Sequence, residues 1–93
     1  MSKTAEYSSV WAALAKTPEE AANLRARAHL VRHIIALVKK ERWTQAEAAR
    51  RCGVTQPRMN DLLRGRISRF SLDALVNIAA RLGRRVRVRI EAA

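Results

Sequence analysis

Apolar residues recur through the first half of the chain at alternating spacings of four and three positions, at Leu24, Ala28, Val31, Ile35 and Val38. Such spacings place side chains on one face of an α-helix and produce a buried stripe. Thr17 and Pro18 precede the stripe as a capping residue and a first-turn proline, and basic residues cluster around Lys40. We therefore predict one long amphipathic helix that begins near Thr17 and ends near Lys40.

Residues 44–65 carry the signals of two short helices joined by a tight turn. Thr44 and Glu47 form a capping-box pattern at the start of the first helix, and Gly53 is placed to end it. Thr55 is a capping residue for the second helix. This arrangement is typical of a helix-turn-helix, in which the second helix can enter the major groove of DNA.

The apolar positions of the two short helices are spaced to face each other. Met59 and Leu62 are three positions apart and point inward, and Ala49 faces them across the turn. A bulkier side chain at Ala49 is expected to push the two helices apart, so its small size belongs to the motif.

The remaining positions of the second short helix look outward and are all polar: Gln56, Arg58, Asn60, Asp61 and Arg64. Gln and Asn can pair with adenine, Arg with guanine, and Asp can accept a hydrogen bond from cytosine. This face therefore has the chemistry to recognise base edges in a major groove. The alternative is a helix face that is simply solvated.

The last third of the chain changes from a helical to an alternating pattern. Ser71 caps a final amphipathic helix, which Gly83 ends. Arginines then alternate with three apolar residues, Val86, Val88 and Ile90. We predict a β-strand in residues 84–93 that pairs with its copy in a twofold dimer, because the chain has no second confident strand. A strand paired with residues 7–11 and a frayed basic tail are the alternatives.

Charge points to a polyanionic partner. The chain has 93 residues, which suits one domain, and 19 basic against 8 acidic residues give it a formal net charge of +11. Nucleic acid is the first candidate and an anionic membrane surface the second, although no apolar run approaches membrane-spanning length. A charge that serves only solubility is the alternative.

Other chemistry has little support in the sequence. Cys52 is the only cysteine, and the N-terminus has no signal-peptide pattern, so we expect a cytoplasmic protein without disulfides. His29 and His33 lie four positions apart, but no further ligand cluster accompanies them. We expect no metal, no cofactor and no enzymatic activity, since there is also no nucleophile–base arrangement or phosphate-binding loop.

The two tryptophans receive different interpretations. Trp43 precedes the motif and is expected to pack the long helix against it. Trp11 lies in a short N-terminal arm, where burial and the anchoring of a partner chain are equally favoured. The chain is thus divided into an arm at residues 1–16, a DNA-binding domain at 17–83 and a dimerisation strand at 84–93.

The motif resembles that of the XRE (Cro/repressor-like) helix-turn-helix family. The matching positions are Thr44, Gln45, Ala49, Gly53, Val54, Thr55, Gln56, Met59, Leu62 and Gly65. With the flanking helices, the resemblance extends from about Pro18 to Ile90. It implies an all-α, lambda-repressor-like helix-turn-helix bundle, to which the present chain adds a long N-terminal helix and the predicted C-terminal β-strand.

Within that family, the long leading helix and the tail are most similar to the HigA-type antitoxins of type II toxin–antitoxin modules. This resemblance implies a homodimeric repressor that binds a palindromic double-stranded operator in its own promoter and neutralises a RelE-like ribonuclease toxin. A stand-alone or phage-type regulator is one alternative. Another is a protein-interaction module, in which residues 7–14 and the long helix hold a partner and nucleic acid binds nonspecifically.

The resemblance also implies roles for two glutamines, with Gln45 at a phosphate or a base edge and Gln56 at the bases. Pro57 departs from the usual Ser or Thr, and Leu63 replaces a frequent acidic residue. The residue chemistry adds Asn60 and Asp61 as base contacts. The complete predicted DNA-binding set is Thr44, Gln45, Thr55, Gln56, Pro57, Arg58, Asn60, Asp61, Arg64, Arg66 and Arg69, in which the arginines hold phosphates.

Overall fold

The structure is a computed structural model and describes residues 16–92. Four α-helices and one short 3₁₀-helix follow one another there: α2 (Pro18–Lys40), α3 (Gln45–Cys52), α4 (Gln56–Leu63), η1 (Ile67–Arg69) and α5 (Leu72–Arg81). The predicted long helix and the two motif helices are confirmed within a residue of their expected ends. The predicted arm at residues 1–16, including Trp11, lies outside the described residues except for Lys16.

A hydroxyl side chain caps the start of each α-helix. The oxygens of Thr17, Thr44, Thr55 and Ser71 accept hydrogen bonds from backbone N–H groups three residues later, at 3.0, 3.1, 3.3 and 3.1 Å. Each of these bonds satisfies a donor that has no partner within its own helix. These four residues are the ones that the sequence marked as helix starts.

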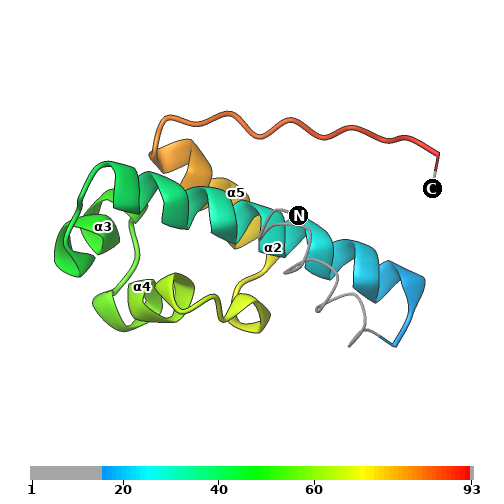
Figure 1. Cartoon of the computed structure of the whole chain (residues 1–93), viewed down its shortest axis with the longest axis horizontal. Helices are drawn as coiled ribbons and strands as arrows, with labels where there is room; N and C mark the ends of the chain where they lie inside the picture. The colour runs from blue at the N-terminus through cyan, green and yellow to red at the C-terminus, as the bar shows by residue number, and fades with distance from the viewer. Residues whose placement is uncertain (1–15, 93) are drawn as a thin grey trace.

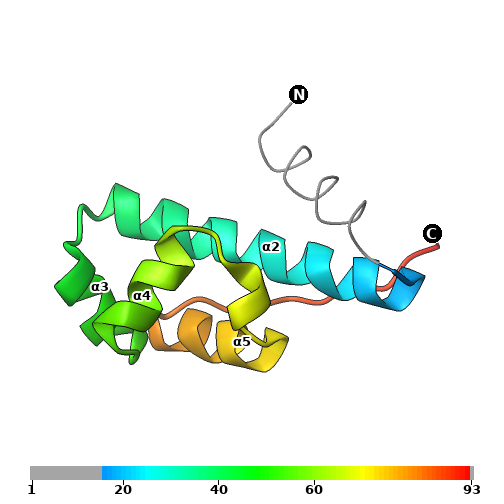
Figure 2. The same cartoon turned by 90° about the horizontal axis from the view of Figure 1, so that it is seen from below.

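The helices pack around one apolar core, with α2 lying along the others (Figure 1). The stripe on α2 contributes Leu24, Ala28, Val31, Ile34 and Val38, all buried. α5 packs along α2, and α4 lies on the underside of the bundle, where Figure 2 shows it between α3 and η1. The core therefore holds α4 by its inner face and leaves its outer face available to a partner.

The turn between α3 and α4 depends on Gly53. Its backbone has the left-handed conformation, with φ of 71°, and its N–H closes the end of α3. A side chain there would also meet the guanidinium of Arg81 from α5. Met59 and Leu62 are fully buried on the inner face of α4, and Ala49 is buried on α3, as the sequence predicts.

The C-terminal segment differs from its predicted structure. Residues 84–92 contain no β-strand, so the strand predicted over residues 84–93 is wrong. The N–H of Arg84 bonds to the carbonyl of Ala79 and completes the end of α5, but no backbone hydrogen bond joins residues 85–92 to the rest of the described chain. The alternating pattern has no second strand to pair with there, and the strand-paired dimer loses its structural basis.

The segment after α5 runs back along α2 toward the start of that helix, on the side opposite α4 (Figure 1). We call residues 84–92 the tail. Val86 is half-buried, whereas Val88 and Ile90 are 85% and 96% exposed. The tail therefore has contact with the helices mainly through its first residues.

Candidate nucleic-acid interface

The outer face of α4 carries the polar residues that the sequence placed there. Gln56, Pro57, Arg58 and Arg64 are exposed, and Asn60 is half-buried. The threonine caps Thr44 and Thr55 lie at the starts of α3 and α4 and are also exposed. The bundle thus brings these predicted positions together on the two motif helices.

A side-chain contact joins the starts of the two motif helices. The Nε2 of Gln45, the first residue of α3, donates a hydrogen bond of 3.3 Å to the backbone carbonyl of Gln56, the first residue of α4. The contact is exposed, and it leaves the side-chain amide of Gln56 free to meet a ligand. Gln45 therefore has a positioning role that does not depend on a direct base contact.

Arg58 is held against the connector that follows α4. Its guanidinium carbon lies 4.4 Å from the centre of the Phe70 ring, and its Nη1 donates a hydrogen bond of 3.1 Å to the carbonyl of Arg69. A guanidinium over an aromatic face is attracted by the ring's electron density. These two contacts hold the Arg58 side chain at the exposed surface beside the connector.

Asp61 forms ion pairs with both arginines of the connector. Its Oδ1 accepts a hydrogen bond of 2.9 Å from Arg66, and its Oδ2 lies 3.3 Å from Nη1 of Arg69. Burial alone would raise the pKa of the Asp61 carboxyl, but the hydrogen bonds and charges of Arg66 and Arg69 outweigh burial and leave that pKa below its ordinary value. The carboxylate is therefore occupied by its own connector.

Three polar side chains, on α4 and on the residue that caps its end, have no hydrogen-bond partner within residues 16–92: those of Gln56, Asn60 and Arg64. An amide can pair with adenine in two hydrogen bonds, and a guanidinium can bind guanine or a phosphate. These three residues form the part of the predicted set with the greatest free capacity for a nucleic acid.

The connector after α4 is anchored to α2 by contacts that were not predicted from the sequence. Ile67 and Phe70 are almost fully buried, and Nη1 of Arg27 on α2 donates to their carbonyls at 3.2 and 3.3 Å. Apolar residues three apart within a basic segment are a signal of a short buried turn. Arg27 carries no comparable signal, because its partners lie 40 and 43 residues away in the chain.

The capping box at α3 forms only in part. The hydroxyl of Thr44 accepts from the N–H of Glu47, but the Glu47 carboxylate binds Arg50 and Arg51, at 2.6 and 2.7 Å. Hydrogen bonds from Arg50 and then Arg51 lower the pKa of Glu47. The guanidinium of Arg51 also lies 4.7 Å from the ring centre of Trp43, which is half-buried against the core as predicted.

Residues 16–92 contain no group of three or more side chains that could hold a metal ion. The rings of His29 and His33 lie 4.6 Å apart, and burial, followed by the charges of His33 and Arg32, lowers the pKa of His29. Burial raises the pKa of the Cys52 thiol, which lies in the core.

None of the described helices has both the length and the apolar character needed to cross a membrane.

Fold and exposed motif helix together define a DNA-binding protein of the helix-turn-helix class. The family model of the helix-turn-helix domain matches residues 13–91, and the chain belongs to this family. Searches among curated proteins and among solved structures found no match. The family match extends through α2, the motif, α5 and most of the tail.

Proposed function

We propose that the protein is a sequence-specific transcriptional repressor that binds an operator in double-stranded DNA. The observation that carries this proposal is that α4 has a buried inner face and an outer face with polar side chains that are unpaired among the described residues. Met59 and Leu62 fix its inner face, while Gln56, Asn60 and Arg64 have no partner within the described chain. A helix held in this way can present its amides to base edges while the neighbouring arginines bind phosphates.

The surroundings of α4 supply the phosphate contacts in this proposal. Arg58 of the recognition helix is held over Phe70, and Arg66 and Arg69 of the connector are held by Asp61, so three guanidinium groups are positioned on this side of the bundle. Fixed arginines lose less conformational freedom on binding than free ones. They would set the orientation of the helix on the duplex, and the amides would then discriminate between sequences.

The proposed protein acts as a homodimer on a pseudo-palindromic site. Two recognition helices about 34 Å apart can enter successive major grooves on one side of the duplex. Val88 and Ile90 are the large apolar side chains that residues 16–92 leave exposed, and a second copy is one surface that would cover them. This interface would rest on side-chain burial and requires no strand pairing.

An antitoxin role is the finer form of the proposal. The motif residues, the long α2 and the basic tail support it through their resemblance to HigA-type antitoxins. The partner would be a RelE-like ribonuclease, encoded beside this protein and neutralised by it. The alternative is a stand-alone or phage-type regulator, for which no neighbouring toxin gene is expected.

Selection of bound duplexes from a random pool tests the repressor proposal. The expected product is an inverted repeat whose half-site centres lie about one helical turn apart. A pool that stays random after several rounds, although the protein still retains DNA, would contradict sequence-specific binding and support the nonspecific interaction module. Purification of the protein together with its genomic neighbour tests the antitoxin role separately.

A further inference from the structure

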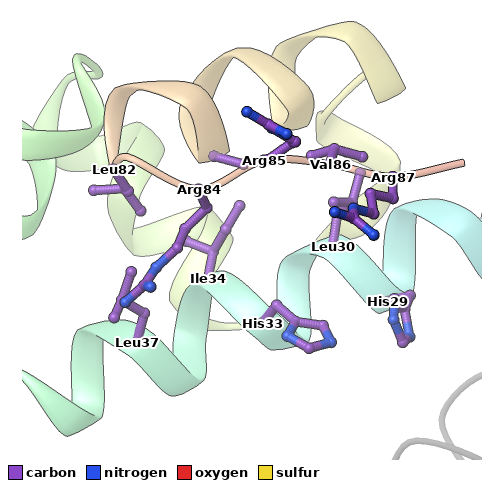
Figure 3. Close-up of a pocket in the computed structure, with 11 residues that line it drawn as sticks. His29, Leu30, His33, Ile34, Leu37, Leu82, Arg84, Arg85, Val86 and Arg87 are labelled. Carbon is purple, nitrogen blue, oxygen red and sulfur yellow. The ribbon is translucent and has the colours of Figure 1, made fainter.

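A cavity lies on the face of the bundle opposite the recognition helix. It has a volume of about 320 Å³, is partly open to solvent, and is lined by α2, the end of α5 and the first residues of the tail (Figure 3). This volume is at the lower end of the range for pockets that hold small molecules. A folded partner or a long peptide would place only a small part of itself there.

The floor of the cavity is apolar. Leu30, Ile34 and Leu37 line it from α2, and Leu82 lines it from the end of α5. Figure 3 shows these side chains gathered beneath the tail, between the two helices. A ligand that fills this space would therefore remove an aliphatic body from water.

The rim of the cavity is cationic. Arg84, Arg85 and Arg87 come from the tail, and Figure 3 shows Arg84 reaching toward Leu37 on α2. Among the described residues, no carboxylate lines the cavity and no ion pair involves a tail arginine. These guanidinium groups are thus free to bind an anionic group at the edge of the apolar floor.

We propose that this cavity binds a small amphipathic carboxylate, with its aliphatic part over Leu30 and Ile34 and its anionic group held at one end of the floor by Arg84 or by Arg87. The cavity shares no lining residue with the predicted DNA-binding set, and the tail lies on the side of α2 opposite α4. The proposal goes beyond DNA binding and does not depend on it. In this proposal the basic tail binds a ligand of its own and is not needed for DNA recognition by α4.

The two histidines of the chain provide a direct probe, because both line this cavity. Octanoate supplies both an aliphatic chain and a carboxylate, acetate supplies only the charge, and octan-1-ol supplies only the chain. Titration of the full chain with octanoate, followed by NMR of the His29 and His33 ring signals, is expected to give saturable shifts with one ligand per chain. Acetate and octan-1-ol are expected to need at least about tenfold higher concentrations for the same shift.

Variants that each remove one positive charge from the tail distinguish specific octanoate binding in the cavity from nonspecific attraction of an anion to a basic protein. Because the two arginines lie at opposite ends of the floor, one of the variants Arg84→Gln and Arg87→Gln is expected to weaken octanoate binding about fivefold to tenfold. Arg89→Gln is the matched control, since Arg89 belongs to the same tail but does not line the cavity. It removes the same charge, and its expected effect on the octanoate affinity is less than about twofold.

Three results would overturn the proposal. The first is the absence of saturable shifts of either histidine with octanoate. The second is an equal response to acetate or to octan-1-ol, which would show that the combination of chain and charge is not recognised. The third is an equal loss of affinity in Arg89→Gln, which would show only nonspecific electrostatic attraction. DNA binding is measured separately, so failure of this site leaves the repressor proposal unaffected.

Discussion

Asp61 on α4 and Arg66 in the connector are joined by a hydrogen bond of 2.9 Å between Oδ1 and Nη1. Arg69 approaches the other carboxylate oxygen at 3.3 Å. The pairing matters for a DNA-binding surface because an unpaired carboxylate beside phosphates would be repelled. It also holds two cations in fixed positions next to the recognition helix.

Replacement of Asp61 by asparagine is expected to lower stability in a pH-dependent way. The pKa of this carboxyl is lower in the folded protein, because the hydrogen bonds and charges of Arg66 and Arg69 outweigh burial. Its contribution is therefore complete above the unfolded pKa, about 3.9, and is lost as pH falls through the lower folded value. Thermal unfolding of wild type and Asp61→Asn at pH 7, 5 and 3 should show a Tm difference that shrinks at the lowest pH.

The control for this experiment is Glu91→Gln, a charge change of the same size in the exposed tail. It is expected to leave Tm close to that of the wild type at pH 7. A Tm difference between wild type and Asp61→Asn that stays constant from pH 7 to pH 3 would contradict a role for the ionised carboxylate.

Alanine replacements on α4 should divide base recognition from phosphate binding. Gln56→Ala is expected to reduce discrimination between operator and altered operator by about 1–3 kcal/mol, because a bidentate amide contact is lost. Arg64→Ala is expected to weaken binding on all sequences alike and to reduce the salt slope by about 1. Fluorescence anisotropy on matched duplexes measures both effects. Indistinguishable profiles for the two variants would refute this division.

The glycine at the turn of the motif should be more costly to replace than a glycine with similar φ elsewhere. Gly53 and Gly83 have φ of 71° and 73°, so alanine at either position is expected to cost about 1–2 kcal/mol of unfolding free energy. Only at Gly53 must the Arg81 side chain also move aside. Urea unfolding should therefore show a larger loss for Gly53→Ala than for Gly83→Ala. The reverse order would contradict the importance of this close approach.

Removal of the Arg27 guanidinium should release the connector. Arg27→Met retains most of the aliphatic stem but loses the two hydrogen bonds to the carbonyls of Ile67 and Phe70, at an expected cost of about 1–2 kcal/mol. Arg25→Met is the control, since Arg25 is exposed on the same helix and forms no ion pair or hydrogen bond within residues 16–92. Chemical denaturation measures both, and equal losses would contradict the anchoring role.

Local signals in the sequence were sufficient for the helices. Hydroxyl residues at Thr17, Thr44, Thr55 and Ser71 mark helix starts because capping involves only three or four neighbouring residues. The spacing of apolar residues likewise identified the buried faces of α2 and α4, since helix geometry converts spacing directly into direction.

Long-range contacts could not be obtained in the same way. Alternation in residues 84–91 indicates which side chains share a side of an extended segment, but it supplies no partner for the backbone, and the predicted strand was wrong. Arg58 and Asp61 do face outward from α4, but the path of the connector brings Phe70, Arg66 and Arg69 to them. That path depends on the anchoring of the carbonyls of Ile67 and Phe70 by Arg27, whose partners lie 40 and 43 residues away and leave no local signal in the sequence.

The most direct test of the repressor account is the affinity of the purified full chain for the DNA upstream of its own gene, compared with scrambled DNA of equal length across a salt series. The account predicts selective binding of two chains per site, which persists near physiological salt while binding to scrambled DNA is lost. Equal affinity for the two duplexes, disappearing in parallel as salt rises, would contradict it.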